Sequence, residues 1–104
     1  MSQSRWVRVG SVRRFDHVRL DRRQARKVVD EAARAYLTWE DWCDLQCEDD
    51  GLLADLLDEC ADVIQATLNL VAALGVEDMR PLMDECERRN RDRGRITDGK
   101  VVDE

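Results

Sequence analysis

The stretch from Leu56 to Val71, LLDECADVIQATLNLV, constrains the fold more than any other part of the chain. It has the length and composition of a core helix, and we expect a helix from about Leu52 to Leu74 that ends at Gly75, a residue suited to the left-handed C-cap position. After Glu59, apolar side chains surround most of its circumference. A helix that is apolar on most sides must be covered on most sides. The pattern therefore predicts a homodimer or a higher oligomer in which this helix is central.

Two further helices are expected beside this one. Apolar and small residues recur at steps of three and four from Ala25 to Cys43, which predicts an amphipathic helix with Asp21 as its N-cap, ending near Asp44 or Gln46. The segment CEDDG that follows has the composition of a connector. A shorter helix, MRPLMDECERRNRDR, is expected to end at Gly94. The fold class is therefore all-α, an antiparallel helical bundle of about three helices whose four-helix-type core is completed by oligomerisation.

The chain has 104 residues, enough for one domain with a modest core. We divide it into a basic N-terminal arm (residues 1–20), a helical domain (21–94) and a flexible tail (95–104). Trp6, Val7 and Val9 are expected to form a short strand or an extended segment. No run has the length of a membrane span or the pattern of a signal peptide, which predicts a cytoplasmic protein without a membrane partner.

The charges are distributed unevenly along the chain. Residues 1–34 carry ten Lys and Arg against four Asp and Glu, whereas residues 35–79 contain twelve acids and no Lys or Arg. Solvent, the basic arm, a second subunit or metal ions must balance these acids. The arm mixes arginines with Trp6 and Phe15, a combination that suits nucleic-acid binding. We favour the alternative, in which the arm neutralises the acidic middle of this subunit or of a neighbouring one.

Cysteines and aromatic residues give weaker signals. The four cysteines lack the CxxC spacing of a zinc site, and free thiols buried as small hydrophobic residues are favoured over zinc ligands or disulfides; they are Cys43, Cys47, Cys60 and Cys86. Tyr36, Trp39 and Trp42 could stack on a base, but aromatic residues at helical spacing more often belong to a core.

Polar residues form one stripe along the second helix. Asp58, Asp62, Gln65 and Asn69 follow one another at steps of four, three and four, and Glu59 shares a face with Asp62. Ionised carboxylates on a partly buried helix are costly unless a cation balances them. Oxygen ligands at this spacing suit Mg²⁺ or Mn²⁺. The stripe would suit a metal–phosphate pocket, but the spacing alone favours the alternative, a solvated helix end with Asp62 paired to the basic arm.

The first helix offers a matching set of charged residues. Lys27, Glu31 and Arg34 lie on one face, and Asp30 precedes Glu31. This set could form the opposite side of the same pocket. The alternative is an ordinary exposed ladder of ion pairs.

The two helices together resemble the MazG-like all-α nucleoside triphosphate pyrophosphohydrolases. DECAD supplies the E-x-x-D motif of that family as Glu59 and Asp62, within the similar setting LLDECADVIQATLNLVAALGV. KVVDEAARAY aligns with the family's E-E-x-x-E run, with Asp30 and Glu31 at the paired positions and Arg34 in place of the third acid. CERRNRDRG is similar to the basic K/R-N-x-x-R segment that often follows.

The resemblance, which covers roughly residues 20–95, implies a dimer or tetramer that cleaves (d)NTPs between the α- and β-phosphates and releases pyrophosphate, in a housecleaning role. The implied cofactor is Mg²⁺, with Mn²⁺ as the alternative. The implied catalytic residues and metal ligands are Glu31, Glu59 and Asp62, with Asp30 and Asp58 as further ligands. The implied substrate-binding residues are Lys27, Arg34, Arg89, Asn90 and Arg93.

Arg34 is the main departure from the family pattern, because it puts a cation where a ligand acid is expected. Either Asp30 or Asp58 replaces the missing acid, or Arg34 contacts a phosphate directly. In the remaining case metal binding and catalysis are weakened, and the protein is a nucleotide-binding or interaction module.

Overall fold

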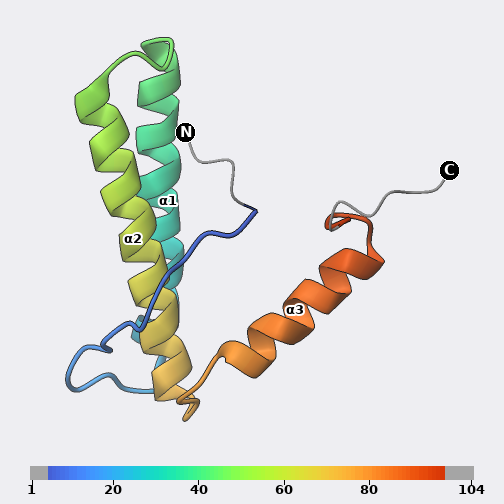
Figure 1. Cartoon of the computed structure of the whole chain (residues 1–104). Helices are drawn as coiled ribbons and strands as arrows, with labels where there is room; N and C mark the ends of the chain where they lie inside the picture. The colour runs from blue at the N-terminus through green and yellow to red at the C-terminus, as the bar shows by residue number, and fades with distance from the viewer. Residues whose placement is uncertain (1–4, 98–104) are drawn as a thin grey trace, which may run out of the picture.

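The computed structural model describes residues 5–97, which contain three helices and no strand. The helices are α1 (Arg22–Asp44), α2 (Asp50–Ala73) and α3 (Arg80–Asp92). α1 and α2 lie side by side as an antiparallel hairpin, an extended arm crosses α2, and α3 stands apart (Figure 1). The all-α class and the three helices are thus confirmed, and the arm (residues 5–20) is the extended alternative rather than the strand. Within the same range, no helix combines the length and hydropathy that a membrane span requires.

Short side chains set the start of both hairpin helices. The carboxylate of Asp21 accepts a hydrogen bond from the backbone N–H of Gln24 (2.9 Å), as expected for an N-cap. Asp49 accepts one from Leu52 in the same way (2.9 Å). α2 therefore begins inside the CEDDG segment, and its last two residues form the first turn of the helix rather than a connector.

The helix ends differ in the residue that takes the left-handed conformation. Gly75 (φ +89°) follows α2 and Gly94 (φ +76°) follows α3, both at the positions that the sequence predicts. After α1 the same conformation falls on Gln46 (φ +57°) and Cys47 (φ +62°). A side chain makes this conformation unfavourable, so the turn between α1 and α2 carries strain that glycine would avoid.

α1 and α2 pack along a seam of residues spaced alternately by four and three, the pattern of helices that cross at a shallow angle. The half-buried seam positions of α1 are Gln24, Val28, Glu31, Ala35, Thr38 and Trp42. Those of α2 are Leu52, Leu56, Glu59, Val63 and Leu70, together with the buried Ala66. Only Ala66 and Asn69 are buried among the residues that the structure describes. The core of one chain is therefore thin, and it contains two carboxylates.

Directly after the seam positions, both hairpin helices carry exposed apolar side chains. The exposed fractions are 63% for Val29, 57% for Tyr36 and 46% for Trp39 in α1, and 61% for Leu57 and 42% for Ile64 in α2. In two antiparallel right-handed helices, the residue that follows a seam position turns to the same side of the pair. These five side chains therefore form one solvent-exposed surface of the hairpin, called the apolar face below. The residues that precede the seam positions lie on the opposite side.

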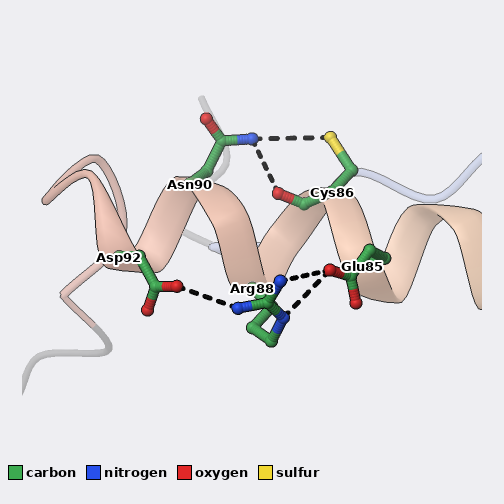
Figure 2. Close-up of polar contacts among 5 residues, drawn as sticks. All are labelled: Glu85, Cys86, Arg88, Asn90 and Asp92. Carbon is green, nitrogen blue, oxygen red and sulfur yellow. Dashed lines mark hydrogen bonds and ion pairs between the residues drawn. The ribbon is translucent and has the colours of Figure 1, made fainter.

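α3 packs on neither helix of the hairpin, since none of its Cα atoms lies within 8 Å of a Cα in α1 or α2. Its polar groups pair within the helix instead. Arg88 forms ion pairs with Glu85 and Asp92 (3.0 Å to Asp92), and the amide of Asn90 donates to the carbonyl of Cys86 (2.9 Å), as Figure 2 shows.

The predicted three-helix bundle is therefore not formed within one chain. α3 has few apolar residues, and its Leu82 and Met83 are about half exposed, 51% and 53%. A helix with so little apolar surface gains little from packing on the hairpin. Of the predicted tail, residues 98–104 lie outside the described residues, and the N–H of Arg95 completes the cap of α3 by donating to the carbonyl of Asn90 (2.9 Å).

Candidate functional site

A polar groove of about 720 Å³ lies on the side of the hairpin opposite the apolar face, where the arm crosses it. α1 contributes Arg23, Lys27 and Glu31 to its wall, and α2 contributes Asp62, Gln65 and Asn69. Several of these residues immediately precede seam positions, which explains why they share one side of the hairpin. The groove thus brings together part of the first-helix set and part of the polar stripe that the sequence singles out.

The arm is held against α2 by two amide side chains of the polar stripe. The side-chain oxygen of Asn69 accepts hydrogen bonds from the N–H of Phe15 (3.0 Å) and from Nε2 of Gln65 (3.0 Å). Nε2 of Gln65 also donates to the carbonyl of Arg13 (3.1 Å). Asn69 is only 3% exposed, so these bonds satisfy an amide that would be costly to bury alone. The C-terminal half of the stripe therefore binds the arm, a role that its spacing did not reveal.

Glu31 occupies a seam position and lines the groove, and its side chain is 15% exposed. Its Oε2 lies 3.9 Å from Nζ of Lys27, and its Oε1 lies 3.7 Å from Nη1 of Arg34. Both contacts are ion pairs whose distances are too long for hydrogen bonds. The buried Oε1 therefore has no hydrogen-bond partner. The ion-pair ladder proposed as the alternative is present, together with an Arg26–Asp30 pair at 3.9 Å. Glu31, however, is not an exposed member of it.

Glu59 lies in the seam one turn before Asp62, and its Oε1 is also buried without a hydrogen-bond partner. It does not line the groove, whereas the exposed Asp62 does. Buried carboxylate oxygens without a partner are rare and unfavourable, and a bound cation is one way to satisfy them. Glu31 and Glu59 are therefore the two acids whose surroundings call for an explanation.

The five predicted metal ligands do not form one cluster in a single chain. Glu31 and Asp62 share the groove, Glu59 lies in the seam, and Asp30 and Asp58 are exposed outside it. Within residues 5–97, no three His, Cys, Asp or Glu side chains lie close enough together to hold a metal ion. Carboxylate oxygens still suit Mg²⁺, which commonly takes one or two carboxylates and completes its shell with phosphate oxygens and water. By donor type, Glu31 and Asp62 fit that pattern.

The predicted substrate-binding residues are divided between the hairpin and α3. Lys27 lines the groove, whereas Arg34 does not. Arg89, Asn90 and Arg93 belong to α3 and its C-cap, and none of them lines the groove. No Cα atom of α3 lies within 8 Å of a Cα atom of the hairpin. One chain therefore brings a single member of this set to the groove.

The groove contains two cations that the sequence reasoning missed. Arg19 comes from the arm and Arg23 from the first turn of α1. The sequence predicts a neutralising role for the arm that contains Arg19, and only the fold shows that Arg19 and Arg23 line the same groove as Glu31 and Asp62.

Phe15 of the arm lines the groove, whereas the aromatic residues of α1 and the four cysteines lie away from it. Tyr36 and Trp39 stack on the apolar face, with ring centroids 6.3 Å apart. A hydrogen bond to Glu40 (2.8 Å) raises the pKa of Tyr36. All four cysteines are free, as predicted, but none is fully buried, so the expectation that they fill a core is wrong. Burial, followed by a hydrogen bond with Cys47, raises the pKa of the Cys43 thiol, which disfavours the thiolate that a metal would need.

Chemically, the groove offers carboxylate oxygens for a hard cation and basic groups for an anion within one cavity. This combination suits a ligand that carries both, such as a metal-bound phosphate. Comparison of the chain with protein-family models, with curated protein sequences and with solved structures gave no match.

Proposed function

We propose that the protein is a Mg²⁺-dependent nucleoside triphosphate pyrophosphohydrolase, with the polar groove as its active site. The observation that carries the proposal is the presence of Glu31 and Asp62 in one groove, with a buried Glu31 oxygen that no hydrogen bond satisfies. A divalent cation would satisfy that oxygen, and Lys27 beside it would face the phosphates. The substrate would be a canonical or modified (d)NTP, in the housecleaning role that the motif resemblance implies.

In this proposal the chain's own residues bind, orient and move a proton. Glu31 and Asp62 would hold Mg²⁺, which would supply Lewis-acid chemistry and lower the pKa of the attacking water. Of the three acids Glu31, Glu59 and Asp62, one that does not bind the metal accepts the proton of that water as general base. Water oxygen joins the α-phosphorus while the bond to the bridging oxygen breaks, so the leaving group is pyrophosphate. Lys27 offsets the negative charge that develops there.

Arg34 favours a second candidate function, a catalytically weakened module that binds nucleotides or another protein. Its Nη1 lies 3.7 Å from the same Glu31 oxygen that a metal would use, so it competes for that oxygen. Arg34→Glu would remove this competitor and add the missing acid. A large rise in Mg²⁺ affinity and turnover in that variant would identify the natural protein as the weakened form.

We propose that the active form is a homodimer or homotetramer with a four-helix core. The apolar face supports this, because five large side chains on one surface of a hairpin are more than an isolated soluble chain usually exposes together. A second copy would cover them with the same residues. We do not favour nucleic-acid binding, because Gln65 and Asn69 already hold the backbone of the arm on α2.

The decisive experiment is pyrophosphate release from a panel of canonical and modified NTPs and dNTPs with Mg²⁺ or Mn²⁺. Glu31→Gln and Asp62→Asn should each reduce turnover by about 100-fold or more, the range for a lost general base or charge stabiliser. Asp55→Asn is the matched control, because Asp55 is an exposed acid on α2 outside the groove. The absence of turnover, or turnover that Glu31→Gln leaves intact, would refute the proposal.

A further inference from the structure

Arg19 and Arg23 are cations of the groove that the predicted site did not include. Other arginines nearby have carboxylate partners: Arg13 pairs with Asp16 (3.2 Å), and Arg26 pairs with Asp30 (3.9 Å). Within residues 5–97, neither Arg19 nor Arg23 forms an ion pair or a side-chain hydrogen bond, and both are exposed. Their guanidinium groups are therefore available to a ligand in the groove.

The basic residues of the groove gather at the end where the arm meets α1. Arg23 precedes Lys27 by one turn of α1, and Glu31 follows by another turn. Asp21 also lines the arm end, but its carboxylate caps α1 by accepting a hydrogen bond from the N–H of Gln24. Arg23 and Glu31 are eight positions apart, which is about 12 Å along a helix. Arg19 lies at the cationic end, and Asp62 lines the groove with Glu31. An elongated anion that carries a metal ion at one end matches this arrangement.

The position of Arg19 depends on the docked arm. Asn69 fixes the backbone at Phe15, four residues before Arg19, and Asp21 then caps α1 two residues after it. The segment that carries Arg19 is thus attached at both ends, and this keeps its side chain beside the groove. Asn69 is accordingly a positioning residue for Arg19.

We propose that Arg19 and Arg23, together with Lys27, form a polyphosphate-binding site at the arm end of the groove. Guanidinium groups bind phosphate oxygens through paired, charge-assisted hydrogen bonds, which suits a polyphosphate chain better than a single carboxylate. The identification of its ligand as the triphosphate of a substrate rests on the proposed function. The binding of polyphosphate itself does not.

Titration calorimetry of the full chain with inorganic tripolyphosphate, without metal, tests the site apart from turnover. Replacing Arg19 and Arg23 together by Ala should weaken binding by about 10-fold or more, since each charge-assisted bond contributes on the order of a factor of ten. The control replaces Arg22 and Arg26 by Ala, which removes the same amount of charge from the first two turns of α1, outside the groove. This control variant should change the dissociation constant for tripolyphosphate less than twofold.

A double-mutant cycle tests the positioning role. Arg19→Ala should weaken tripolyphosphate binding in the natural chain and have little further effect in a chain that already carries Asn69→Ala. In the Asn69→Ala chain, the amide hydrogen of Phe15 should also exchange with solvent faster. Equal losses for the groove pair and the control pair, or no binding of tripolyphosphate to the natural chain, would overturn the site. An additive cycle would overturn the role of Asn69. A chain that binds tripolyphosphate through Arg19 and Arg23 but releases no pyrophosphate would support the site while refuting the hydrolase proposal.

Discussion

Replacing Glu59 by Leu should make the protein more stable, although the change is at a proposed catalytic position. Glu59 occupies the seam between Leu56 and Val63, where α1 and α2 pack. Its buried Oε1 has no hydrogen-bond partner, so folding removes this oxygen from water without compensation. A leucine would continue the apolar seam on both sides of the position.

The magnitude follows from two contributions. An unsatisfied buried acceptor costs about 1–3 kcal/mol, and Glu59→Leu removes that cost. The leucine also buries apolar groups at about 0.8 kcal/mol per CH₂, less here because the position is only half-buried and the new side chain must fit the seam. We expect the free energy of unfolding to rise by about 1–3 kcal/mol, and the Tm by roughly 4–8 °C for each kcal/mol.

Chemical denaturation followed by circular dichroism measures this change, with the m-value checked for constancy. Asp58→Leu is the matched control, because Asp58 is the preceding, exposed acid of the same helix and should shift stability by no more than about 0.5 kcal/mol. If Glu59→Leu lowers stability, or matches the control, then Glu59 has a favourable partner and the reasoning about the seam is wrong. If the natural chain binds Mg²⁺ through Glu59, adding Mg²⁺ should reduce the difference in the free energy of unfolding between the natural chain and the Glu59→Leu variant.

Three further predictions concern the turn, the start of α3 and the apolar face. Gln46→Gly should raise the free energy of unfolding by about 1 kcal/mol in the same assay, because glycine adopts the left-handed conformation without strain. Hydrogen bonds from the side chain and backbone of Arg80 hold the pKa of Asp78 at about 2, below its ordinary value of 3.8. The contribution of this pair to folding stability should therefore be complete above pH 3.8 and lost as the pH falls toward 2. A carboxyl NMR titration of Asp78 should show this midpoint, and Arg80→Ala should raise it. Tyr36→Glu combined with Ile64→Glu should convert the proposed oligomer to monomer in analytical ultracentrifugation, whereas an unchanged mass would exclude the apolar face as the interface.

The helices could be predicted from sequence because their signals are local. Asp21 caps α1 through its own side chain, and Gly75 and Gly94 end α2 and α3 because they tolerate positive φ. The turn after α1 could not be predicted in this way. Its left-handed residues are Gln46 and Cys47, which carry no such preference and are held there by the packing of the two helices they join.

The periodic pattern also could not distinguish which part of a wide apolar surface packs within the chain. The predicted face of α1 includes both Val28 and Val29, and both Ala35 and Tyr36. The hairpin uses Val28 and Ala35 in its seam and leaves Val29 and Tyr36 exposed. Neighbouring residues on a helix differ in direction by about 100°, so one broad stripe contains an inner and an outer surface. Only the partner helix decides between them.

Part of the groove lining could be predicted, because helical spacing places Asp62 near Gln65 and Asn69 without any knowledge of the fold. What spacing could not show is that the stripe serves two purposes. Asn69 and Gln65 satisfy their own polar groups on the arm, whereas the seam oxygens of Glu31 and Glu59 find no hydrogen-bond donor in the described part of the chain. Two such carboxylates weaken a core this thin. A ligand whose cation coordinates these oxygens would recover that loss on binding, and the cations that would hold its anionic end already line the same groove as Glu31.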